Sequence, residues 1–127
     1  MKRILFLAAA VALFSNVQAQ DDFENEPILP AEAQECVLPA SPNAIPEDAT
    51  YDQLVAAKKQ VADFQGDIEQ FRSCLKAAED NPDNTPGNLA AIVSSYNYSV
   101  EMEERVAERF NEAVRSYKER KAQSEDS

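Results

Sequence analysis

The stretch from residue 54 to residue 75 constrains the fold of this chain more than any other feature of its sequence. Apolar residues recur along it in steps that alternate between three and four without a gap. This is the a/d spacing of an α-helix that buries one narrow stripe against a partner helix. The chain is therefore predicted to be built on packed helices. We name this set the first stripe, and it consists of Leu54, Ala57, Val61, Phe64, Ile68, Phe71 and Leu75.

Both ends of this first helix carry boundary signals. Thr50 and Gln53 have the spacing of a capping box, in which the threonine hydroxyl and the glutamine side chain satisfy opposing backbone amides. The composition changes abruptly at Asp80 to turn-forming residues that continue to Asn88. We therefore predict a helix that starts between residues 49 and 52 and ends at residue 78 or 79.

The sequence predicts a second helix that ends near residue 121. Thr85 followed by Pro86 is typical of an N-cap with proline at the first helical position. A second apolar stripe follows, and Ile92, Val106 and Ala113 widen it on one side, which indicates contact with more than one neighbour. The second stripe consists of Leu89, Val93, Tyr96, Val100, Glu103, Ala107, Phe110, Val114 and Tyr117.

Glu103 is the one charged residue within the second stripe. A lone buried carboxylate is expensive, so Glu103 needs a cationic neighbour or an open edge. The approximate register of the two helices makes Lys58 or Lys59 the expected partner.

Two long helices joined by a short loop predict an all-α fold, an antiparallel two-helix coiled-coil-like hairpin over residues 50–121. Residues 122–127 are polar and are expected to form a disordered tail. Residues 20–35 are acidic and carry few apolar groups, which predicts a second disordered tail. The prolines of residues 36–49 exclude a continuous helix and predict an extended, Pro-rich N-terminal arm.

Residues 1–19 have the pattern of a secretory signal peptide. Lys2 and Arg3 precede an apolar run that ends at Phe14, and cleavage is expected between Ala19 and Gln20. The apolar run holds 11 residues, which is short of the roughly 20 that a helix needs to cross a bilayer. We therefore expect an exported protein, periplasmic or secreted, with no membrane insertion after signal cleavage.

Cys36 and Cys74 are the two cysteines of the chain. In an oxidising compartment an intramolecular disulfide is the expected state, and a disulfide-linked dimer and free thiols are the alternatives. The bridge requires the arm to span the length of the helix. The helix from residue 50 to residue 74 is about 36 Å long, and an extended arm from residue 36 to residue 50 spans about 43 Å. The arm should lie along the helix, where Val37, Leu38 and Ile45 are available to cover the widened stripe.

Several short runs stand out together from residue 36 onward. They are Cys36-Val37-Leu38-Pro39, Ile45-Pro46-Glu47-Asp48-Ala49-Thr50, Phe71-Arg72-Ser73-Cys74-Leu75, Arg109-Phe110-Asn111 and Tyr117-Lys118. In these runs the chain resembles a family of small exported proteins from Proteobacteria with a Cys-Pro-rich arm and a Cys-Leu pair near the end of the first helix. The resemblance implies export and paired cysteines, and it implies no catalytic residue and no ligand.

The sequence offers few groups for catalysis or metal binding. It contains no histidine, which is the commonest general base and metal ligand. Bridged cysteines leave no thiolate nucleophile, and the carboxylates lie mainly on predicted exposed faces. Residues 80–84 gather oxygen ligands, but the sixth and twelfth positions of an EF-hand counted from there are Thr85 and Ile92, so turn chemistry is the better interpretation. We expect no enzyme, no metal site and no cofactor.

The acidic balance excludes two classes of partner. The net charge is −11, and it becomes −13 when the signal peptide takes away two of the 12 basic residues and none of the 23 acidic ones. Such a chain is repelled by nucleic acid and by anionic lipid. A protein partner or self-association remains.

Two functional hypotheses follow from this reading. One is a protein–protein interaction or structural module of the cell envelope, and the alternative is a periplasmic chaperone-like or stress-related protein that binds unfolded clients. The widened stripe discriminates between them, because a covered stripe leaves little apolar surface for clients.

Overall fold

The computed structural model describes residues 20–126, with side chains from residue 23 onward. Its elements are α1 (Gln20–Asn25), α2 (Ala31–Gln34), α3 (Tyr51–Glu79) and α4 (Pro86–Glu125). Within this range the chain is all-helical and forms no strand. The predicted signal peptide, residues 1–19, lies outside the described residues.

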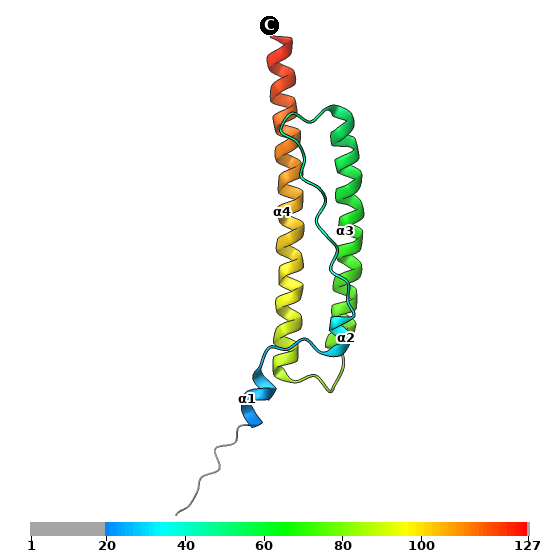
Figure 1. Cartoon of the computed structure of the whole chain (residues 1–127), viewed down its shortest axis with the longest axis vertical. Helices are drawn as coiled ribbons and strands as arrows, with labels where there is room; N and C mark the ends of the chain where they lie inside the picture. The colour runs from blue at the N-terminus through cyan, green and yellow to red at the C-terminus, as the bar shows by residue number, and fades with distance from the viewer. Residues whose placement is uncertain (1–19, 127) are drawn as a thin grey trace, which may run out of the picture.

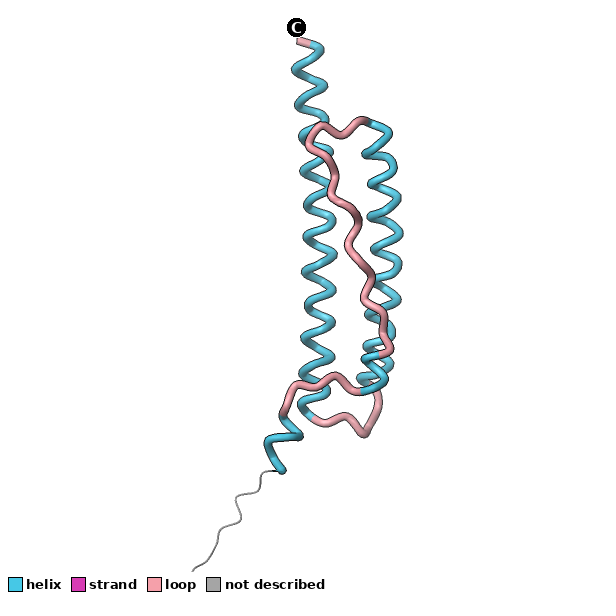
Figure 2. The backbone as a smooth tube through the Cα atoms, in the orientation of Figure 1, coloured by secondary structure: helices cyan, strands magenta, loops and turns pink. Residues whose placement is uncertain are grey.

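The two long helices form the body of the molecule. Figure 1 shows α3 and α4 side by side, with the chain running down α3 and returning along α4, whose last turns extend beyond the start of α3. Residues 37–46 form neither helix nor strand, and in Figure 2 they run along the two long helices. Across residues 20–126, no helix combines the length and the apolar character that crossing a membrane requires.

Capping boxes set the starts of both long helices. At α3 the Gln53 backbone N–H donates to Thr50 Oγ1 at 3.2 Å, and the Thr50 N–H donates to Gln53 Oε1 at 2.9 Å. At α4 the same reciprocal pair joins Thr85 and Asn88 at 3.1 and 3.0 Å, with Pro86 as the first helical residue. Each box satisfies two amides that a helix start leaves without partners. The predicted starts of both helices and the end of the first are confirmed.

The first stripe is the core-facing side of α3, as predicted. Ile68 and Leu75 are completely enclosed, at 0% and 1% exposure, and Val61 is half-buried. Burying a side chain of this size stabilises the fold by about 1.5–3 kcal/mol. The fully buried members of the stripe are Leu54, Ala57, Phe64, Ile68, Phe71 and Leu75, and Ala78 continues it.

The second stripe was placed wrongly on α4. Leu89 and Val93, two of its members, are 38% and 50% exposed. The residues expected only to widen the stripe, Ile92 and Val106, are in the core at 1% and 7% exposure. The prediction used apolar residues alone, whereas the buried face of α4 includes the polar residue Ser99. The buried residues of α4 are Gly87, Ala91, Ile92, Ser99, Met102 and Val106.

Residues 20–35, predicted as a disordered tail, include the short helices α1 and α2 and attachments to the two long helices. Ala33 is 3% exposed and belongs to a core cluster, and Leu29 packs against the same cluster. The Asn88 side-chain amide also donates to the Ile28 carbonyl at 2.7 Å, and that of Asn81 donates to Glu32 at 3.0 Å. The acidic composition concealed these few apolar and polar attachments, which are enough to order the segment against the ends of α3 and α4.

The C-terminal tail also departs from the prediction, because α4 continues to Glu125. No glycine or proline follows Gly87 in the sequence, so nothing stops the helix from propagating. The Ser124 hydroxyl donates to the Lys121 carbonyl at 2.8 Å, and the Asp126 N–H donates to the Ala122 carbonyl. Residues 122–125 are therefore helical and exposed rather than irregular.

The segment between α2 and α3 is attached at both ends. Cys36 and Cys74 form the predicted disulfide, with an S–S distance of 1.97 Å and a Cα–Cα distance of 5.6 Å. At the other end, the Arg120 guanidinium donates to the carbonyls of Glu47 and Ala49, the latter at 2.8 Å. The segment thus connects the end of α3 covalently to a contact with the last turns of α4.

Replacing both cysteines by alanine should lower the free energy of unfolding by about 4 kcal/mol, because the disulfide closes a loop of about 39 residues and restricts the unfolded chain. Urea unfolding of the variant and of the oxidised wild type, followed by circular dichroism, measures the difference. An unchanged unfolding midpoint would show that the bridge contributes no stability.

Gly87→Ala and Gly66→Ala should have opposite effects. A Cβ at Gly87 would lie 1.9 Å from the Glu26 carbonyl oxygen, whereas a Cβ at Gly66 meets nothing within 4 Å. Gly66→Ala should therefore raise the free energy of unfolding by about 1 kcal/mol through helix propensity. Gly87→Ala should lower it by about 1–3 kcal/mol, because the segment against it must shift. Chemical denaturation compares the two, and equal gains would mean that residue 26 does not pack on α4.

Candidate interaction surface

A polar cluster joins the last third of α3 to α4. The Arg72 guanidinium donates through Nη2 to Glu103 Oε2 at 2.6 Å and through Nε to Ser99 Oγ at 3.0 Å. The Ser99 hydroxyl donates in turn to the Tyr96 carbonyl at 2.6 Å, and the guanidinium lies 5.7 Å from the centre of the Tyr96 ring. Ser99 is fully buried, and the side chains of Arg72 and Glu103 are 18% and 28% exposed.

This cluster corrects the predicted partner of Glu103. The expected cation was Lys58 or Lys59, but Lys59 pairs with Asp63 on its own helix at 2.8 Å. The hydrogen bond to Asp63, followed by the charge of that carboxylate, raises the pKa of Lys59. The signal for Arg72 was present in the sequence, because it follows the stripe residue Phe71 and its long side chain can reach across the helix pair.

The groups of this cluster serve the packing of α3 against α4. The Ser99 hydroxyl gives its proton to a backbone carbonyl and accepts from a guanidinium, which cannot act as a base in proteins. A nucleophilic serine needs a neighbouring base to take its proton. The arrangement instead fixes the register of α3 against α4, since both carry hydrogen-bonding groups that only this alignment satisfies.

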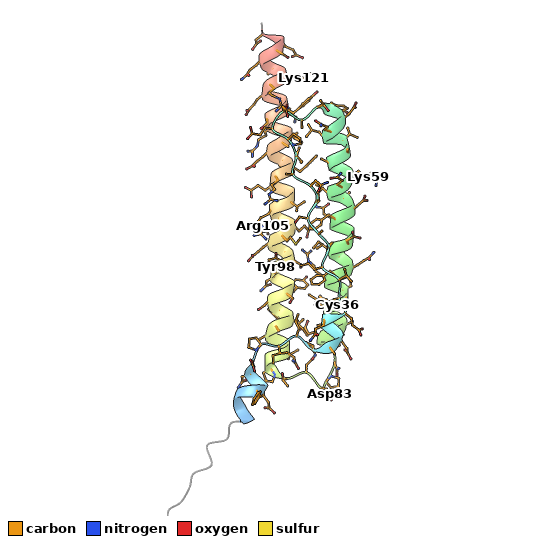
Figure 3. All side chains as sticks on the ribbon, in the orientation of Figure 1. Cys36, Lys59, Asp83, Tyr98, Arg105 and Lys121 are labelled. Carbon is orange, nitrogen blue, oxygen red and sulfur yellow. A yellow bond between two sulfur atoms is a disulfide. The ribbon has the colours of Figure 1, made fainter. Side chains whose placement is uncertain are left out.

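A largely apolar groove lies beside this cluster, between the start of the N-terminal segment and the two long helices. Its volume is about 370 Å³. Leu38 and Tyr98, at 39% and 49% exposure, present apolar surface at its edge. Figure 3 shows Tyr98 on α4 and Cys36 beside the lower part of α3. The groove is lined by Leu29, Ala33, Gln34, Cys36, Leu38, Phe71, Leu75, Ser94, Ser95 and Tyr98.

The N-terminal segment covers the helix pair only in part, and not with all the residues expected. Ile45 is half-buried and lines a small cavity with Val61 and Val106. Val37, by contrast, is 79% exposed. Leu38 stands at the groove with one face open, and on α4 the Arg105 guanidinium lies 6.0 Å from the centre of the Tyr98 ring. Leu38 and Tyr98 bring two of the exposed large apolar side chains together at this groove, and others lie elsewhere, among them Val37, Val55 and Val93.

The residues between α3 and α4 form a turn stabilised by their own side chains. The Asp83 N–H donates to Asn81 Oδ1 at 3.0 Å, and the Asn84 amide donates to the Ala78 carbonyl at 2.7 Å. These bonds stabilise the turn and cap the end of α3. The part of the chain that the structure describes contains no group of three or more His, Cys, Asp or Glu residues suited to a metal ion.

No family model, curated protein or solved structure matches the chain. The interpretation of the surface therefore rests on its own residues and geometry.

Arg72→Met should lower the free energy of unfolding by about 2 kcal/mol, because it leaves the partly buried Glu103 carboxylate and the Ser99 hydroxyl without their donor. Adding Glu103→Gln should recover part of this loss by removing the unpaired charge. Lys59→Met is the matched control, since the side chains of its ion pair are 78% and 63% exposed, and it should leave stability unchanged. Equal losses in Arg72→Met and Lys59→Met in urea unfolding would contradict a structural role for the cluster.

Proposed function

We propose that this chain is an exported, non-enzymatic helical-hairpin protein of the cell envelope, periplasmic or secreted, that binds a protein partner. The observation that carries the proposal is the groove between Leu38, Phe71 and Tyr98, an open apolar surface built on a disulfide-stapled scaffold. An apolar groove with a polar edge suits one segment of a partner protein.

The scaffold in this proposal is an antiparallel coiled-coil-like hairpin of α3 and α4 with residues 36–49 as its extended arm. The disulfide at Cys36 and the hydrogen bonds from Arg120 at the other end of the arm support this reading. Fixing the arm at both ends limits the conformations that it must lose on binding. A preorganised surface of this kind keeps more of its contact energy as affinity.

The partner segment in this proposal is apolar and carries positive charge at its ends. The net charge of −11 favours a cationic partner, and the exposed carboxylates of Glu32 and Glu35 lie on and beside α2, next to the groove residues Ala33 and Gln34. An apolar side chain of the partner would enter between Leu38 and Tyr98. The basic groups beside it would then meet the acidic edge.

The buried state of Ile92 and Val106 favours this function over the chaperone-like alternative. Those residues were the apolar surface that a client-binding cradle would have required, and they are in the core at 1% and 7% exposure. The groove is a bounded apolar surface rather than a broad apolar cradle along the helix pair. A single groove suits a single kind of partner.

Leu38→Asp should weaken binding of an amphipathic peptide of leucine and lysine at least tenfold, because it places a carboxylate on the apolar wall of the groove. Val55→Asp is the matched control, since Val55 is an exposed valine on α3, 53% exposed, and does not line the groove. Isothermal titration measures both, and a peptide of leucine and glutamate should not bind. Equal affinities of Leu38→Asp and the wild type would place the binding surface elsewhere.

Cross-linking in the native envelope should recover one stoichiometric protein when a photoreactive residue replaces Tyr98, and none when it replaces Val55. A broad range of unfolded clients at both positions would favour the chaperone-like alternative. Turnover of a substrate by the purified protein would contradict the non-enzymatic part of the proposal.

A further inference from the structure

The outward face of α4 carries a heptad pattern that the fold does not use. Val93, Val100, Ala107 and Val114 recur at intervals of seven residues, and Val93 is 50% exposed while the other three are half-buried. None of these four residues belongs to a core cluster of the described chain. This row keeps one position of the heptad, a spacing at which a helix can pack against a second helix.

Charged residues border this row, negative toward the middle of the helix and positive toward its end. Glu104 and Glu108 are followed by Arg115 and Lys118, and all four side chains are exposed. Among residues 20–126 the ion pairs are Lys59–Asp63 and Arg72–Glu103, so none of the four is paired within its own chain. A hollow on the outer side of α4 is lined by Glu104, Ala107, Glu108, Asn111, Val114 and Arg115.

We propose that a second copy of this chain binds here, with the two α4 helices antiparallel about a twofold axis near Asn111. This axis sets Glu104 opposite Lys118 of the second copy and Glu108 opposite its Arg115, each pair occurring twice by symmetry. The same axis places Ala107 against Val114 of the second copy. The charges and the apolar row are therefore self-complementary in one register.

The antiparallel direction follows from the order of the charges. In a parallel pair in register, Glu104 would face Glu104 and Lys118 would face Lys118, and like charges at these positions are repulsive. The overlap runs from about residue 97 to residue 125, which is about 42 Å of helix. It contains Val100, Ala107 and Val114 of the row, and Val93 lies beyond it. The groove at Tyr98 is on a different side of α4 from Val93 and Val100, because residues two or five positions apart on a helix do not share a face.

This self-association is independent of the proposed partner at the groove. Loss of peptide binding in Leu38→Asp, with dimerisation intact, would concern the groove alone. Loss of dimerisation with intact peptide binding would concern the outer face of α4 alone.

Charge reversal tests the pairing in the purified, oxidised protein. Glu104→Lys should weaken dimerisation at least tenfold in sedimentation equilibrium at low salt, and adding Lys118→Glu in the same chain should restore it to within threefold of the wild type. Glu69→Lys makes the same change of net charge at an exposed position on α3, away from the proposed contact, and it should not weaken dimerisation. Failure of the double variant to recover, or a wild type that stays monomeric at several hundred micromolar, would overturn the proposal.

Cysteine trapping tests the direction of the helices. Asn111→Cys lies at the axis and should form an intermolecular disulfide under mild oxidation, whereas Asn97→Cys, two heptads away, should not. Peptide mapping must also find the native Cys36–Cys74 bridge intact. Cross-linking at both positions would indicate a parallel dimer, cross-linking at residue 97 alone would indicate another register, and cross-linking at neither would leave no dimer at this face. Each of these three results would contradict the antiparallel arrangement.

Discussion

A pair of helices cannot enclose its own core, and this constraint governs the rest of the structure. Two packed helices touch along one line, so side chains beside that line stay open to water unless a third element covers them. Here the third element is the segment that precedes α3, held by the Cys36–Cys74 bridge and by Arg120. Its residue Ile45 and the α2 residue Ala33 enclose parts of the core at opposite ends of the helix pair.

Covalent attachment is the physical reason why so short a covering segment can work. The segment buries few large side chains, because Val37 is open to solvent and Leu38 is partly so. Its own packing would not offset the entropy of ordering an irregular chain. The disulfide removes much of that entropy from the unfolded state, so the remaining contacts need only choose the path of the segment. The groove beside Leu38 is a consequence of this incomplete covering.

The sequence was sufficient to predict α3 and its stripe, because the stripe residues recur at one regular spacing on a single face of the helix and its capping box is local. It was insufficient for α4, whose apolar residues form two faces, one against α3 and one outward. Periodicity gives the spacing of a face but not which of two faces is buried. Ser99 shows this limit most clearly. A serine in a helical pattern is predicted to be exposed, and its burial is explained by the hydrogen bond that it accepts from Arg72 on the other helix. The groove could not be predicted for the same reason, because its walls come from α2, the segment that precedes α3 and both long helices.

The unused face of α4 also changes what the acidic composition means. A charge of −11 on each copy opposes association at long range. At physiological salt the screening length is about 8 Å, so only charges near the contact decide whether two copies hold together. Near Asn111 those charges are of both signs and are ordered along the helix, whereas the excess of carboxylates is spread over the rest of the surface. Acidity can therefore keep the protein dispersed against unspecific contacts and still permit one register of self-association, in which Glu104 and Glu108 each meet a cation.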